Sequence, residues 1–261
     1  MSFLEYTDIF NFDFPYVEKY THEGIYHCFR EPPILTVVSG ARCSDGIVLI
    51  ADRKISTVYG RELRFEDKIR GDLAHILIGY AGRVSMFDIF RKYVVGDVLI
   101  RRSKDPYTPE NFITESAHSV KRFNELVYNP DFFFEVLVAK HQWKNSELYH
   151  IDFSGKHKEV KYKAIGSGEE TANKFCAGLS HEEVTMKDFL KHAYFAIEFM
   201  DQYHPELKVG IEPDGIPDIK YLYYNQEWDK EPPKQDIDDC KKYSKEKLEQ
   251  FRQAFEKIVK E

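Results

Sequence analysis

The sequence predicts a layered α+β sandwich, in which antiparallel sheets pack against pairs of helices. Three observations lead to this fold class: strand patterns come in separate blocks, predicted helices come in pairs between those blocks, and no repeat with a period of roughly 20–50 residues recurs. Paired helices between antiparallel strands do not form alternating β-α-β units. The doubly wound dinucleotide-binding folds are therefore disfavoured.

The first strand block is a predicted β-hairpin of largely buried strands. Its strands read ILTVVSGARC and IVLIADRKIS, and the turn Ser44-Asp45-Gly46 separates them. A polar loop over 57–67 and a third apolar alternation over 75–80 follow.

The rest of the chain is expected to alternate helices and strands. Apolar stripes at helical spacing and a Pro109-Glu110 start predict the first two helices, and Ser154-Gly155 is expected to be a turn between strands. The expected elements are helices over 83–100 and 109–127, strands over 132–140, 147–153 and 159–165, helices over 169–179 and 186–203, and a strand over 218–224.

Three regions are expected along the chain. Residues 1–33 form an aromatic-rich extension or propeptide that closes on Pro32-Pro33, residues 34–240 form the main domain, and residues 241–261 form a charged amphipathic helix. Disordered chains are poor in aromatic residues, so the extension is expected to stay attached and packed.

Composition excludes several classes of function. With 37 Lys+Arg against 44 Asp+Glu, the 261-residue chain has a formal net charge of −7 and lacks the basic stripe that nucleic-acid binding needs. The apolar stretches are too short to span a membrane, and the acidic start is unlike a signal peptide. The chain is expected to be cytoplasmic, with four separated cysteines (28, 43, 176 and 240) in no disulfide or zinc pattern.

Four residues near one edge of the predicted sheet suggest a nucleophile site. Hairpin pairing brings the neighbourhood of Asp52 beside Thr36, and a carboxylate there would hold the Lys68 ammonium near the threonine hydroxyl. A nearby ammonium lowers the effective pKa of a hydroxyl. Gly82, just past a strand, would offer its N–H to an oxyanion.

The motif around these residues resembles the proteasome subunit family. The run TVVSGARCSDGIVLIADRK is similar to the family's opening strands, and Asp52, Lys68 and Gly82 follow Thr36 by the family's offsets of 16, 32 and 46 residues. The segment AIGSG looks like the motif that supplies a serine, here Ser167, and Asp201 stands where the family has an acidic partner. The resemblance covers roughly residues 34–225.

The resemblance implies a four-layer αββα sandwich of the N-terminal nucleophile hydrolase type. It implies a threonine-type endopeptidase made as a precursor, in which Thr36 is the nucleophile after cleavage of the preceding bond. Lys68 would lower the pKa of its hydroxyl, Asp52 would orient Lys68, Gly82 would donate to the oxyanion, and Ser167 and Asp201 would support the freed amine. It implies rings with itself or other such subunits and polypeptide substrates. No cofactor is expected, and the ten histidines show no clustered spacing that predicts a metal site.

Two departures from the family pattern leave other functions open. Leu35 precedes Thr36 where active subunits generally have glycine, and His204 replaces the serine that usually follows Asp201 by three positions. A long lead and a charged last helix also resemble the non-catalytic α-type ring subunits. A hydrolase or acyl-transferase of the same fold with a different nucleophile is the third alternative.

Each candidate residue also has a structural interpretation. Thr36 fits a run of β-branched strand residues, and Asp52 with Lys68 would serve as a structural ion pair. Gly82 suits a turn, and Ser167 suits the N-cap of a helix. Asp201 is unfavourable near a helix C-terminus, which suggests that its carboxylate has a partner.

Overall fold

The structure is a computed structural model, and the chain divides into two units, Met1–Glu31 and Pro32–Glu261. All described residues lie in the second unit, so the predicted extension over 1–33 and the Leu35–Thr36 junction lie outside them. The structure describes residues 36–260 except 57–62, 74, 83–86, 88–89, 91–108, 128–133, 143–144, 180–182, 208, 212–214 and 225–229.

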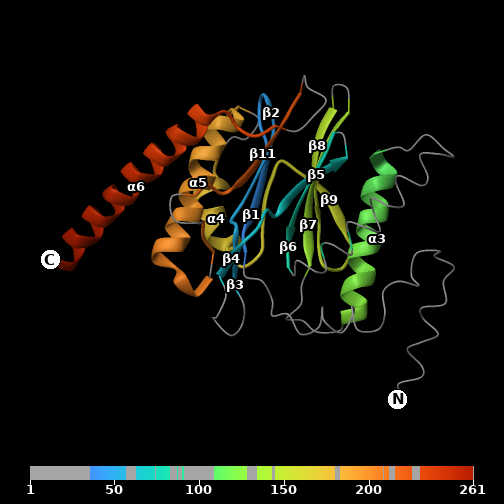
Figure 1. Cartoon of the computed structure of the whole chain (residues 1–261), viewed down its shortest axis with the longest axis horizontal. Helices are drawn as coiled ribbons and strands as arrows, with labels where there is room; N and C mark the ends of the chain where they lie inside the picture. The colour runs from blue at the N-terminus through green and yellow to red at the C-terminus, as the bar shows by residue number, and fades with distance from the viewer. Residues whose placement is uncertain are drawn as a thin grey trace, which may run out of the picture. The chain divides into compact units, whose positions relative to one another are not determined.

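A four-stranded antiparallel sheet carries the predicted hairpin. Its strand order is β10-β1-β2-β11, with β1 and β2 in the centre (Figure 1). Every residue of β2 is buried, as expected for a strand covered on both faces. The strands are β1 (Val38–Arg42), β2 (Gly46–Ala51), β10 (Tyr162–Ile165) and β11 (Asp218–Tyr223).

A five-stranded antiparallel sheet, in the order β5-β6-β7-β8-β9, packs against the first one. A short two-stranded ribbon, β3 with β4, continues from the end of β2. The strands are β3 (Lys54–Ser56), β4 (Leu63–Phe65), β5 (Ile69–Leu73), β6 (Ile76–Ala81), β7 (Glu135–Gln142), β8 (Asn145–Ile151) and β9 (His157–Val160).

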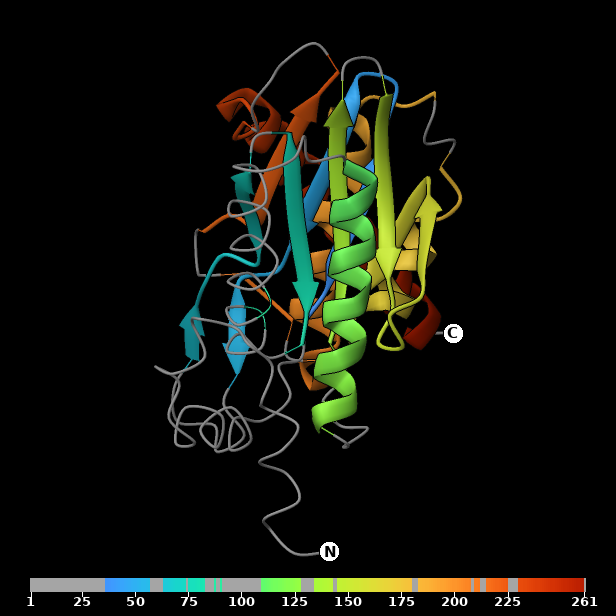
Figure 2. The same ribbon diagram turned by 90° about the vertical axis from the view of Figure 1, so that its right-hand side faces the viewer.

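Helices cover the outer faces of both sheets. Helices α4 (Glu169–Cys176) and α5 (Met186–Tyr203) lie on the four-stranded sheet, α6 (Lys234–Lys260) packs along α5, and a short 3-10 turn, η5 (Pro205–Leu207), follows α5. On the other side, α3 (Pro109–Val127) lies over the five-stranded sheet (Figure 2).

Three clusters of buried apolar side chains fill the spaces between neighbouring layers. One joins α4, α5 and α6 to the four-stranded sheet, one joins α3 to the five-stranded sheet, and one fills the space between the two sheets. Burial of these side chains supplies the main driving force for folding. The layers confirm the predicted αββα sandwich.

Several expectations need correction in detail. The single strand expected over 159–165 is two strands, β9 and β10, which belong to different sheets. The polar loop expected over 57–67 contains β4. Helix α6 begins at Lys234 rather than at residue 241. It starts directly after Pro233, whose carbonyl accepts from the Asp236 and Ile237 N–H groups, and its first turns bury Ile237 and Cys240 in the core.

Other predicted elements are confirmed where the structure describes them. The helices expected at 109–127, 169–179 and 186–203 correspond to α3, α4 and α5. Most of the helix expected over 83–100 lies outside the described residues, although Phe87 and Phe90 are helical and buried. Among the helices that the structure describes, none is both long enough and apolar enough to cross a membrane.

Candidate active site

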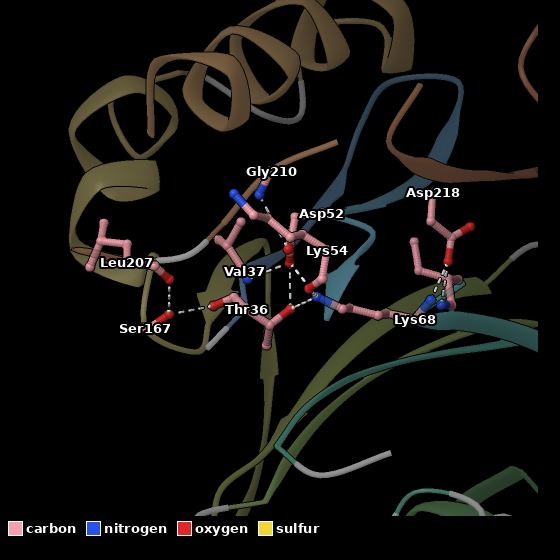
Figure 3. A network of polar contacts seen from close by, with 10 residues as sticks. Thr36, Val37, Asp52, Lys54, Lys68, Ser167, Leu207, Gly210 and Asp218 are labelled. Atoms are coloured by element: carbon pink, nitrogen blue, oxygen red, sulfur yellow. Dashed lines mark hydrogen bonds and ion pairs between the residues drawn. The ribbon is translucent and has the colours of Figure 1, made fainter. Parts of the chain in front are cut away.

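Thr36, Asp52 and Lys68 converge at one end of the two sheets. The Thr36 hydroxyl donates to Asp52 Oδ1 at 2.5 Å and accepts from Lys68 Nζ at 2.6 Å (Figure 3). The same carboxylate oxygen accepts from Lys68 Nζ at 2.7 Å and from the Val37 N–H at 2.9 Å. Antiparallel pairing explains the approach, because Val38 lies opposite Ala51 and the residues just outside that pair therefore face each other.

The site is closed to solvent in the described chain. Thr36 and Lys68 are each 1% exposed, and Asp52 is fully buried. The Lys68 ammonium also donates to the Lys54 carbonyl at 2.9 Å, so its three protons face three acceptors. Burial lowers the pKa of Lys68 below its usual value, and the charge of Asp52 opposes that shift.

A glycine-rich turn holds the main chain of Thr36. Its carbonyl accepts from the Ser167 hydroxyl at 3.1 Å and from the Gly168 N–H at 3.2 Å. Gly166 adopts φ +91°, and a Cβ there would lie 2.4 Å from the Thr36 carbonyl oxygen. Only glycine fits that approach without displacing the threonine.

Ser167 is therefore placed beside the predicted nucleophile. The Leu207 carbonyl lies 3.5 Å from the same hydroxyl and is a second, more distant acceptor for its single proton. The N-cap of α4 is Gly168, and no side chain caps that helix, so the interpretation of Ser167 as an N-cap is wrong.

Asp201 lies near the C-terminal end of α5, and its carboxylate has the partner that its position suggested. Asp201 Oδ1 pairs with Lys54 Nζ at 3.3 Å. Lys54 in turn offers its carbonyl to Lys68, so Asp201 connects to the buried site through Lys54. His204 is the C-cap of α5.

Gly82 follows β6, the neighbour of β5 in the five-stranded sheet. It is buried and adopts φ +130°, a backbone conformation that favours glycine. This conformation fits the interpretation as a turn glycine. Its donation to an oxyanion stays a prediction.

Two residues that contact the site, Gly210 and Lys54, were not predicted from the sequence. The Gly210 N–H lies 3.4 Å from Asp52 Oδ2, and its carbonyl accepts from the N–H groups of Arg53 and Lys54 at 3.1 Å each. A Cβ at Gly210 would lie 2.3 Å from Asp201 Oδ1. Sequence spacing gave no signal for Gly210, whereas Lys54, two positions after Asp52, was available as a cation near a carboxylate.

The arrangement places one hydroxyl between a carboxylate and an ammonium in a dry site. Electrostatic interactions are strong where water is excluded, so the ammonium would stabilise negative charge that developed on the threonine oxygen. The carboxylate accepts the hydroxyl hydrogen bond and aligns the ammonium. These are the features of an activated hydroxyl nucleophile.

Comparison with known proteins gives the family. The sequence model described as "Proteasome subunit" matches residues 36–202. The chain is 22% identical over 161 residues to proteasome subunit alpha type-2-A of Arabidopsis thaliana, covering 61% of this chain and 68% of that protein. Proteasome subunit alpha type-2-B of the same plant matches with the same identity and coverage. The match begins at Thr36 and includes strands β1 to β10 from both sheets, and the chain belongs to the proteasome subunit family.

Proposed function

We propose that this chain is a proteasome-family subunit whose Thr36 is a latent threonine-type nucleophile for peptide-bond hydrolysis. The observation that carries the proposal is the Lys68 ammonium, which lies 2.6 Å from Thr36 Oγ and 2.7 Å from Asp52 Oδ1 in a buried site. In an intact chain the threonine nitrogen is part of a peptide bond. Cleavage between Leu35 and Thr36 would release the amine that completes the site.

The energetics of the buried pair favour a chemical role. Removing two charges from water costs several kcal/mol per ion, on the order of what their attraction returns, so a buried salt bridge is weak support for stability. A buried lysine whose pKa is shifted beside a hydroxyl is, by contrast, typical of functional sites. The preorganised ammonium is therefore better accounted for by charge stabilisation at Thr36 than by folding.

The reaction then follows from the residues around Thr36. The freed amine takes the hydroxyl proton as Oγ attacks a peptide carbonyl, and the same proton passes to the leaving amine as an ester forms on Thr36. Water, deprotonated by the threonine amine, hydrolyses the ester and restores the hydroxyl. Lys68 stabilises the oxygen while it carries negative charge, and Asp52 keeps the ammonium in place.

Intact mass and N-terminal sequencing of the full chain test this function. A fraction of the chain is expected to begin at Thr36, that fraction should hydrolyse fluorogenic peptides, and Thr36→Ala should leave the chain whole and inactive. Leu35→Gly should increase the processed fraction, because glycine permits the tight bend that self-cleavage needs. A Leu35→Gly chain that stays whole, with Thr36 unlabelled by a hydroxyl-directed activity probe, would overturn the proposal.

A second candidate function is a non-catalytic ring subunit. The α-type names of the two Arabidopsis relatives and the Leu35-Thr36 junction favour it. In that case Thr36, Asp52 and Lys68 join strands at the sheet edge, and assembly with other subunits is the role. Light scattering of the unprocessed chain distinguishes the two candidates: stable rings without any processed fraction support this second function.

A further inference from the structure

Asp218 reaches the site from the far edge of the four-stranded sheet. It is the first residue of β11, lies opposite Ala51 of β2, and is 5% exposed. Its Oδ2 accepts from two consecutive N–H groups of the other sheet, those of Lys68 and Ile69, each at 2.6 Å (Figure 3). A carboxylate that accepts backbone N–H groups forms charge-assisted hydrogen bonds, which are stronger than neutral ones.

Lys68 is consequently held at three points. Asp218 holds its N–H, the Tyr80 N–H donates to its carbonyl at 3.3 Å, and its ammonium contacts Thr36 and Asp52. The first two points fix the main chain where β5 begins. From that anchored position the lysine side chain extends to the threonine hydroxyl.

We propose that Asp218 is a positioning residue, which sets where the Lys68 ammonium lies relative to Thr36. The inference rests on the proposed function, since it gives Asp218 a part in the same nucleophile site. It adds a third acidic group, from β11, that the motif around Thr36 does not contain.

Asp218 can position Lys68 because its carboxylate is the acceptor for the N–H groups of Lys68 and Ile69. The described contacts of these two N–H groups include no other acceptor. Without the Asp218 carboxylate, the N–H groups of Lys68 and Ile69 would be buried and unsatisfied, a state that folded proteins avoid. The main chain would move toward water or another acceptor. A displacement of about 1 Å is enough to reduce catalysis roughly 100-fold in preorganised sites.

Native-state lysine acylation of the full chain, read by mass spectrometry at Lys68, tests the positioning without needing peptidase activity. Lys68 should be protected in the unaltered chain and in Asp218→Asn, because the Asn carbonyl oxygen still accepts both N–H groups. In Asp218→Ala, acylation of Lys68 should be at least about tenfold faster. Should Asp218→Ala fail to fold, Asp218→Glu serves instead, since its longer side chain moves the acceptor.

The matched control is Asp45→Ala. Asp45 Oδ1 also accepts a backbone N–H, that of Met186 at 2.8 Å, at the turn between β1 and β2. This variant should leave Lys68 protected. Equal protection of Lys68 in the unaltered chain and in both Asp218→Ala and Asp218→Glu would overturn the inference, as would an equal gain of labelling in Asp45→Ala.

A second measurement in the Leu35→Gly background separates this inference from the proposed function. Cleavage before Thr36 should be about 100-fold slower with Asp218→Ala and less than about tenfold slower with Asp218→Asn. If Leu35→Gly alone is not cleaved, the proposed function fails, and the acylation result still decides whether Asp218 positions Lys68. Equal cleavage rates with and without Asp218→Ala would overturn the positioning role.

Discussion

Lys54 Nζ lies 3.3 Å from Asp201 Oδ1, while the carbonyl of the same lysine accepts from the Lys68 ammonium at 2.9 Å. One residue of β3 thus joins the end of α5 to the buried site, with its side chain facing outward and its main chain facing inward. The side chain of Lys54 and its main-chain carbonyl should therefore contribute separately to the stability of the fold and of the buried site.

Replacing the side chain of Lys54 tests the outer half. Lys54→Met should lower the free energy of unfolding by less than about 1 kcal/mol, because the two partners are partly exposed and such ion pairs contribute little. Lys174→Met, which removes the surface pair with Glu170, is the control and should have no measurable effect. Urea denaturation measures both, and a loss above about 2 kcal/mol for Lys54→Met would contradict the separation.

Removing one partner of the buried ion pair between Asp52 and Lys68 should lower the free energy of unfolding far more. Lys68→Met leaves the Asp52 carboxylate buried without its ammonium, and such changes cost about 3–5 kcal/mol. The double variant Asp52→Asn with Lys68→Met should recover much of that loss, since no uncompensated charge remains. Denaturation of Lys68→Met, Asp52→Asn and the double variant forms a thermodynamic cycle. If the losses in unfolding free energy of the single variants simply add in the double variant, the two residues are not coupled.

Stability should depend on pH through Asp218. Burial raises the pKa of its carboxyl to about 6, although two backbone N–H groups oppose the shift, and the unfolded value is about 3.9. The folded state therefore binds the proton more tightly, so this group's contribution to stability falls as pH rises from about 4 to about 6.

The comparison variant is Asp218→Asn, which stays neutral over that range. The difference in unfolding free energy between the unaltered chain and the variant should change by about 2 kcal/mol between pH 4 and pH 7, because most of the pKa difference of about two units, at 1.36 kcal/mol each, is titrated over that range. Urea titrations at several pH values give that difference. A constant difference would refute the assigned shift.

Gly166 should tolerate no side chain. Gly166→Ala is expected to cost about 1–3 kcal/mol from its positive φ alone, and more from collision with the Thr36 carbonyl. Gly178→Ala is the control, because a Cβ there meets nothing within 4 Å. Thermal denaturation should separate the two variants clearly, and equal melting temperatures would contradict the close approach at Thr36.

The central part of the site could be predicted because it depends on local pairing. The hairpin of β1 and β2 sets Thr36 beside Asp52, and alternating apolar residues mark both strands in the sequence. The same reasoning names Lys68, the family resemblance adds Ser167, and the structure places both against Thr36.

The remainder depends on contacts that no local pattern encodes. Asp218 and Gly210 are 150 and 158 residues from their partners Lys68 and Asp52, and an acid at a strand start or a glycine in a loop is common in any sequence. The change of sheet between β9 and β10 was missed for a similar reason. Both strands have ordinary strand composition, and only the packing of the two sheets separates them at Lys161.

The central place of β1 has a consequence for the junction before Thr36. The residue pairs of that strand, with β2 on one side and with β10 on the other, all begin at Val38, and the Val37 carbonyl accepts from the Asp52 N–H. A break in the chain ahead of Thr36 would therefore leave all of these pairs intact, and the threonine would stand two residues before a strand that stays paired on both sides. Peptide-bond cleavage before Thr36 would thus leave the strand pairing of the four-stranded sheet intact.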